Sequence, residues 1–118
     1  MSESPATNPV PVETRGEAVI ARPQSKMMDD VLLKALGQAV DEAAGASSGI
    51  SLVVIDLSRA QIIPSLALGL LVQMSTKCKS RQQKLKLAAV QPTVRQVFAI
   101  TRLDRIFDFA PTVEAALE

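Results

Sequence analysis

The stretch that most constrains the fold is an apolar run in the middle of the chain, residues 50–57. Ile, Val and Leu occupy six of its eight positions, and turn-forming residues flank it. Such a run predicts a strand that is buried on both faces, as the central strands of parallel sheets are. A short loop then leads to a predicted helix from Ser65 to about Arg81. A strand followed by a helix is the building unit of a parallel α/β sheet.

Segments on both sides predict more strands and helices of the same kind. The other predicted strands cover residues 12–15, 18–21, 85–90 and 106–109. The other predicted helices run from Asp29-Asp30 to Gly45, over residues 92–101, and from Pro111 to Leu117. We therefore expect an α/β fold: one domain with a mixed, mostly parallel sheet of four or five strands and about four helices. An antiparallel strand pair is expected near the N-terminus.

Length and composition limit the number of domains and indicate the cellular compartment. A chain of 118 residues, 47% of them hydrophobic, can bury one core but not two. Residues 1–11 hold three prolines among small polar residues, so we expect a flexible tail there and a single domain at residues 12–118. The longest apolar run, residues 66–72, is far shorter than the ~18 residues that span a membrane, and no secretory signal is apparent. Because the lone Cys78 cannot form an internal disulfide, a cytoplasmic location without membrane insertion is expected.

The residue types exclude several kinds of chemistry. The chain has no histidine and one cysteine, so no metal site and no other cofactor is expected, and the commonest general base is missing. Neither the phosphate-binding P-loop nor the dinucleotide-binding glycine pattern occurs. Ser65 lacks the preceding glycine of a hydrolase nucleophile elbow and has no triad partner. These observations predict a binding module and not an enzyme.

Positive charge is concentrated in one part of the chain. Residues 57–103 contain eight Lys and Arg residues and no Asp or Glu, although the net charge of the chain is only +1. We favour the interpretation that these cations stabilise the C-terminus of the 65–81 helix and solvate the turn after it. They can also attract an acidic protein or, weakly, a nucleotide. Direct nucleic-acid binding is disfavoured, because only three phenylalanines are available for base stacking.

Ser65 stands where the loop turns into the 65–81 helix. The free N–H groups and the partial positive charge of a helix N-terminus can hold an anion or a covalently attached phosphate. The position equally suits a serine that merely caps the helix. Asp56, at the end of the 50–57 strand, is expected to accept hydrogen bonds from loop N–H groups, although ligands and partners also meet α/β folds at that end of a strand.

The helix that begins at Ser65 has more apolar residues than one core-facing stripe requires. The predicted stripe consists of Ala67, Leu70, Leu71, Met74 and Cys78. Leu66, Leu68 and Val72 lie off this stripe. They are either covered by a neighbouring element or form an exposed apolar patch around Ser65.

Four segments of the chain, taken in order, form a characteristic pattern. They are Val53-Val-Ile-Asp-Leu-Ser, Ile62-Ile-Pro-Ser-Leu-Ala-Leu-Gly-Leu-Leu, Lys84-Leu-Lys-Leu-Ala-Ala-Val-Gln-Pro-Thr-Val-Arg-Gln-Val-Phe and Ile100-Thr-Arg-Leu-Asp-Arg-Ile-Phe. Together they resemble the STAS domain of bacterial anti-sigma factor antagonists. The order and the spacing of the segments make the resemblance specific, and it covers residues 12–118. It implies a STAS fold and a role in the regulation of transcription.

The resemblance also implies a mechanism. In this family a kinase-type anti-sigma factor phosphorylates a serine at the N-terminus of the second helix, and only the unphosphorylated antagonist binds that factor and frees the sigma factor. Ser65 falls at the phosphoacceptor position, while Asp56 and Gly69 match an acidic residue and a glycine of the family pattern. The expected partner-binding residues are Asp56, Pro64, Ser65, Leu66, Leu68, Gly69 and Val72.

The sequence around the serine departs from the best-known family pattern. Members of that type have Asp-Ser-Ser-Gly or Asp-Ser-Thr-Gly, whereas this chain has Pro64-Ser65-Leu66-Ala67. Proline suits the start of a helix, so the turn can still form, but a kinase partner would have to recognise an apolar lip. The alternative is a STAS scaffold, or an interaction subunit of a stress-sensing or lipid-transport assembly, that is not phosphorylated.

Overall fold

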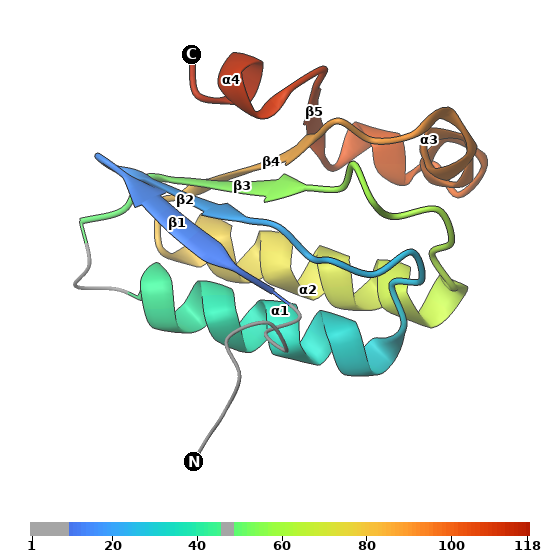
Figure 1. Ribbon diagram of the computed structural model, residues 1–118, viewed down its shortest axis with the longest axis horizontal. Helices are drawn as coiled ribbons and strands as arrows, with labels where there is room; N and C mark the ends of the chain where they lie inside the picture. The colour runs from blue at the N-terminus through green and yellow to red at the C-terminus, as the bar shows by residue number, and fades with distance from the viewer. Residues whose placement is uncertain (1–9, 46–48) are drawn as a thin grey trace.

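A computed structural model describes residues 10–45 and 49–118, which form a five-stranded sheet with helices on both of its faces (Figure 1). The strands lie in the order β1-β2-β3-β4-β5, and β1 pairs antiparallel with β2 while the other neighbours are parallel. The strands are β1 (Val12–Arg15), β2 (Ala18–Ala21), β3 (Leu52–Asp56), β4 (Lys84–Ala88) and β5 (Asp108–Ala110). The helices are α1 (Asp30–Ala43), α2 (Ser65–Ser80), α3 (Pro92–Ile100), the 3₁₀ helix η2 (Leu103–Arg105) and α4 (Val113–Ala116). The predicted α/β class, strand count and mixed sheet are confirmed.

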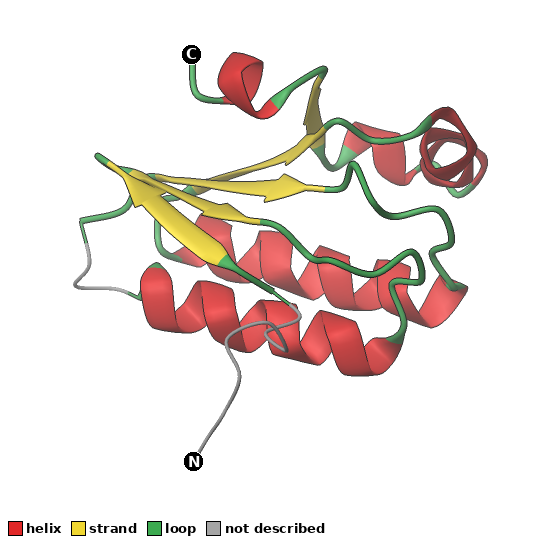
Figure 2. Ribbon diagram, viewed as in Figure 1, coloured by secondary structure: helices red, strands yellow, loops and turns green. Residues whose placement is uncertain are grey.

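The β3 strand is the centre of the molecule, as its composition predicts. Val53, Val54 and Ile55 are completely buried, and they alternate between the two faces of the sheet. Val53 and Ile55 belong to the core beneath α1 and α2, which lie side by side along one face of the sheet (Figure 2). Val54 belongs to a smaller cluster under α4 on the other face. A strand covered on both sides can therefore be apolar throughout.

Aromatic packing joins α3 to the last strand. Phe98 meets Phe107 and Phe109 edge to face, with ring centroids 5.5 and 5.4 Å apart. This geometry is the one that aromatic pairs prefer. All three phenylalanines of the chain are therefore used to fix α3 against the sheet.

Three strands have other bounds than predicted: β3 covers Leu52–Asp56 and not residues 50–57, and β4 and β5 differ for reasons of backbone geometry. β4 stops at Ala88 and not at residue 90, because Ala89 adopts a left-handed backbone with φ of 56°. β5 begins at Asp108 and not at residue 106, because η2 extends the connection: Ile106 N–H donates to Leu103 O. The parallel ladder with β4 starts only where Lys86 faces Asp108.

The folded domain begins before residue 12. Val10 is 3% exposed and packs in the larger core, and Pro11 O accepts a hydrogen bond from Arg22 N–H. These two residues, assigned above to the tail, therefore belong to the domain. The rest of the predicted tail, residues 1–9, lies outside the described residues.

Candidate functional site

The α2 helix begins at Ser65 without a side-chain cap. Pro64 occupies the N-cap position in an extended conformation, with φ of −65° and ψ of 157°, and the first turn contains no acidic residue. Ser65 is exposed, and its hydroxyl makes no hydrogen bond within residues 10–45 and 49–118. The interpretation of Ser65 as a plain N-cap is therefore wrong: Pro64 takes the cap position with an extended backbone that its fixed φ allows, and Ser65 is the first helical residue.

Two loops form the surface beside Ser65. The segment before α1 runs parallel to the segment before α2, with a bridge between Met27 and Ile62. Met28 N–H donates to Ile62 O at 2.9 Å, and Lys26 O accepts from the N–H groups of Gln61 and Ile62 at 2.8 and 3.0 Å. These bonds place the start of α1 next to the start of α2, at the same end of the helical layer (Figure 1).

Four large apolar side chains are exposed at this end. Their exposed fractions are 44% for Met27, 72% for Val31, 52% for Ile62 and 67% for Leu66. Val31 lies in the first turn of α1, Leu66 in the first turn of α2, and the other two on the paired loops. We call these four residues the apolar end surface. Leu66 was expected from the sequence, whereas the other three could not be found without knowing that the two loops pair.

The remaining α2 residues separate into exposed and buried ones. Gly69 is exposed, and a Cβ atom there would meet nothing within 4 Å. Val72 is half-buried against the core. Leu68 is only 3% exposed, so its expected place in a contact surface is corrected: it belongs to the core. The buried face consists of Ala67, Leu68, Leu71, Met74, Ser75 and Cys78, while Leu70, predicted to be in the core stripe, is half-buried. The buried arc is shifted because α2 packs against both the sheet and α1.

Asp56 supports the loop that leads to Ser65. One carboxylate oxygen accepts a hydrogen bond from Ser58 N–H at 2.9 Å, and the other lies 3.6 Å from Nε of Arg22. The expectation that Asp56 bonds a loop N–H group is confirmed. Gln91 holds the same loop from the other side, through a 2.7 Å bond from its Nε2 to Ser58 O.

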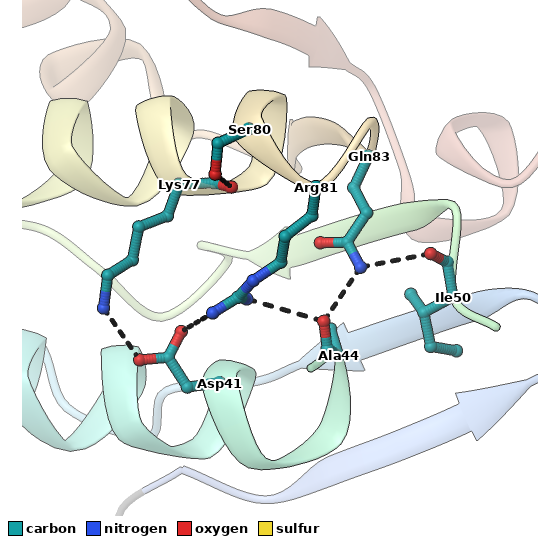
Figure 3. Close-up of polar contacts among 7 residues, drawn as sticks. All are labelled: Asp41, Ala44, Ile50, Lys77, Ser80, Arg81 and Gln83. Atoms are coloured by element: carbon teal, nitrogen blue, oxygen red, sulfur yellow. Dashed lines mark hydrogen bonds and ion pairs between the residues drawn. The ribbon is translucent and has the colours of Figure 1, made fainter. Parts of the chain in front are cut away.

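Several cations of the basic segment already have internal partners. Lys77 and Arg81 both bind the Asp41 carboxylate at 3.0 Å, which joins the C-terminal parts of α1 and α2 (Figure 3). Lys86 donates to Ala116 O at 3.1 Å, and the Arg95 guanidinium lies 3.8 Å from the centre of the Phe109 ring. These contacts support a structural use for this part of the charge.

Within the described ranges no cluster of three or more metal-ligating side chains occurs. Likewise, none of the helices seen in residues 10–45 and 49–118 has the length and apolar character needed to cross a membrane.

Burial raises the pKa of the Cys78 thiol, which reduces its fraction of reactive thiolate at neutral pH.

Comparison with known proteins defines the family. The STAS domain model matches residues 10–116, and the chain therefore belongs to the STAS domain family. A search of curated proteins finds no significant match. Solved structures also match, and several of them are anti-sigma factor antagonists, whereas others are larger proteins such as a murine anion transporter.

Three of these structures illustrate the similarity. An anti-sigma factor antagonist from Mycobacterium paratuberculosis is 27% identical, with a TM-score of 0.76 over 98% of this chain and 96% of the other. A putative anti-sigma factor antagonist from Thermotoga maritima is 22% identical, with a TM-score of 0.79 over 92% and 91% of the two chains. Unphosphorylated SpoIIAA of Bacillus is 19% identical, with a TM-score of 0.73 over 92% of each chain. The chain is a STAS domain similar to anti-sigma factor antagonists.

Proposed function

We propose that this chain is an anti-sigma factor antagonist that binds a serine-kinase-type anti-sigma factor through the end of the molecule around Ser65, and that phosphorylation of Ser65 prevents this binding. The observation that carries the proposal is the exposed Ser65 hydroxyl, which lies at an uncapped helix N-terminus next to the exposed side chains of Leu66 and Ile62.

The local geometry suits a switch. A phosphate brings a charge of about −1.5 to −2. The N-terminus of α2 tolerates this charge because its first N–H groups have no side-chain acceptor and no carboxylate lies in its first turn. A partner that buries Leu66 and Ile62 would have to desolvate the same phosphate, which is unfavourable. Phosphorylation therefore blocks docking without unfolding the domain.

The similarity to the mycobacterial antagonist supports this function, because it extends over nearly the whole of both chains. The Bacillus protein SpoIIAA has been solved in unphosphorylated and phosphorylated forms, and both share the fold of this chain, with TM-scores of 0.73 and 0.68.

A second function uses the same surface without phosphorylation. Pro64 and Leu66 flank the serine with apolar groups, and the first turn of α2 lacks acidic residues. This arrangement favours permanent contact with an apolar partner surface, as in a scaffold or an interaction subunit of a larger assembly. The two functions differ in whether Ser65 carries a phosphate in the cell.

The test compares Ser65→Ala and Ser65→Asp with the wild type. A kinase-type anti-sigma factor from the source organism is purified, incubated with the chain and ATP, and the mass of the chain is measured. We expect one added phosphate on the wild type and none on Ser65→Ala. By calorimetry, Ser65→Asp should bind the factor at least about tenfold more weakly, a change of ~1.4 kcal/mol. The melting temperature should change little.

Two results would contradict the proposal. Equal losses of binding and thermal stability in Ser65→Asp would make Ser65 a structural residue. An unmodified Ser65 together with tight binding would favour the scaffold function.

A further inference from the structure

A groove runs between α1 and α2 on the side of the helical layer that faces away from the sheet. Its volume is about 280 Å³. Gly37, Leu70 and Met74 form its apolar floor, and Lys34, Asp41 and Lys77 are the charged residues along its edges. The groove lies next to the apolar end surface, because Leu70 follows Leu66 by one helical turn on α2.

Gly37 keeps this groove open. It lies in the interior of α1, where glycine lowers helix stability relative to alanine. A Cβ atom there would meet nothing within 4 Å, and the backbone does not adopt a left-handed conformation. The fold therefore does not require glycine at this position. What glycine provides is space for an atom that comes from outside the domain.

The charges at the groove favour an acidic occupant. The Asp41 carboxylate is bound by both Lys77 and Arg81, with N–O distances of 3.0 Å (Figure 3). Lys34 is exposed and makes no ion pair within the part of the chain that the structure describes. Lys77 and Arg81 thus neutralise Asp41 from within the domain, and Lys34 adds a positive charge at the groove that attracts a carboxylate of a partner.

The shape of the groove favours a helix over a small molecule. The lining residues recur at helical spacing along two neighbouring helices, so they form the kind of furrow that receives the side chains of a third helix.

We propose that this groove binds an acidic amphipathic helix of the partner that docks at Ser65. An apolar side chain of that helix lies over Gly37 between Leu70 and Met74, and its carboxylates face Lys34 and Lys77. The inference rests on the proposed function, since it names the second contact made by the same partner. Docking then has two parts. The partner buries the apolar end surface only when Ser65 carries no phosphate, and the groove adds affinity and fixes the partner's orientation.

The experiment uses the full chain and the purified kinase-type anti-sigma factor, with binding measured by calorimetry. Gly37→Leu fills the groove, and Ala99→Leu is its matched control on the exposed side of α3. Lys34→Glu reverses the free charge, and Lys79→Glu is its matched control on α2 outside the groove. Circular dichroism and melting curves establish that each variant is folded.

We expect Gly37→Leu and Lys34→Glu to weaken binding at least about tenfold, while both controls stay within about twofold of the wild type. Lys34→Arg should retain binding, and the effect of Lys34→Glu should shrink at 0.5 M salt because the contact is electrostatic. Gly37→Ala should fold at least as stably as the wild type, because the position has room for a Cβ atom. It provides a second test if Gly37→Leu fails to fold. A loss of affinity on adding this one methyl group supports close approach of the partner, and unchanged affinity argues against it.

The outcomes separate the two proposals. If Ser65→Asp abolishes binding while the folded Gly37 and Lys34 variants bind like the wild type, the groove is not a contact and the inference fails alone. If the wild-type chain does not bind the purified factor, the proposed function fails, and the inference fails with it.

Discussion

Ala89 shows how one residue ends a strand in this fold. Its φ of 56° lies in the left-handed region, which costs a residue with a side chain roughly 1–2 kcal/mol relative to glycine. The position is held by a 3.0 Å hydrogen bond from Ala89 N–H to Ala110 O, which also fixes the end of β5. The chain therefore accepts strain at this residue in order to leave the sheet and begin α3.

We expect Ala89→Gly to raise the free energy of unfolding by about 0.5–1 kcal/mol, because the relief of strain exceeds the added entropy of the unfolded chain. Ala99→Gly, in the exposed part of α3, should instead lower it by up to about 1 kcal/mol. Urea denaturation of both variants measures the difference. A destabilised Ala89→Gly protein would show that the left-handed backbone at residue 89 is not strained.

At the scale of elements, the C-terminal ends of α1 and α2 are tied by polar contacts. Besides the Asp41 ion pairs, buried Gln83 donates from Nε2 to Ala44 O and Ile50 O, at 2.8 and 3.1 Å (Figure 3). The side-chain oxygen of Gln83, Oε1, is buried without a partner in the described part of the chain. This amide holds together the two ends of the connection between α1 and β3.

The Asp41 ion pairs make stability depend on pH. Partial burial opposes ionisation of Asp41, but the hydrogen bonds from Lys77 and Arg81 outweigh it and lower the pKa of this carboxyl. A lowered pKa in the folded state stabilises the protein above the unfolded pKa, and the stabilisation is lost as the pH falls through the folded value.

We therefore expect Asp41→Asn to be less stable than the wild type at pH 7, by less than about 1 kcal/mol because the pair is partly exposed. The difference should shrink as the pH falls below the unfolded pKa of an aspartate and disappear once the carboxyl is protonated in the folded state as well. Denaturation at several pH values checks this. A constant difference across that range would mean that packing, and not charge, ties the helices.

The elements themselves could be predicted well because their signals are local. The apolar run at residues 50–57 predicts a covered strand, and Asp29 predicts the start of α1, where its side chain accepts from Leu32 N–H. The exposure of individual α2 residues could not be predicted in this way. Leu68 and Leu70 have the same chemistry, and only the packing of α2 against α1 and the sheet decides which one is buried. The apolar end surface likewise depends on hydrogen bonds between loops more than thirty residues apart in the sequence.

At the scale of the molecule, the sheet is covered by two unequal cores. The larger one contains the buried residues of α1, α2 and α3. The smaller consists of Ile20, Val54, Ala88, Val113 and Ala116, so the short α4 helix covers the middle of the second face. A helix of four residues can remain folded there because its stability comes from this packing.

Val113→Ala should therefore lower the free energy of unfolding by about 1.6 kcal/mol, as expected for removing two buried carbon atoms. Val31→Ala, at an exposed position of α1, should have almost no effect. Thermal unfolding of both variants provides the measurement. If the two substitutions had equal effects, α4 would not be packed on the sheet.

The pairing of the two loops beside Ser65 reduces the conformational entropy that would be lost when a partner binds there. Because backbone hydrogen bonds hold residues 26–28 and 61–62 together in the free protein, the recognition surface is preorganised. A partner then does not have to order these loops, and little conformational entropy is lost when it binds. Under the proposed function, a small surface of this kind can be bound tightly, and a single phosphate on Ser65 at its edge would be enough to release the partner.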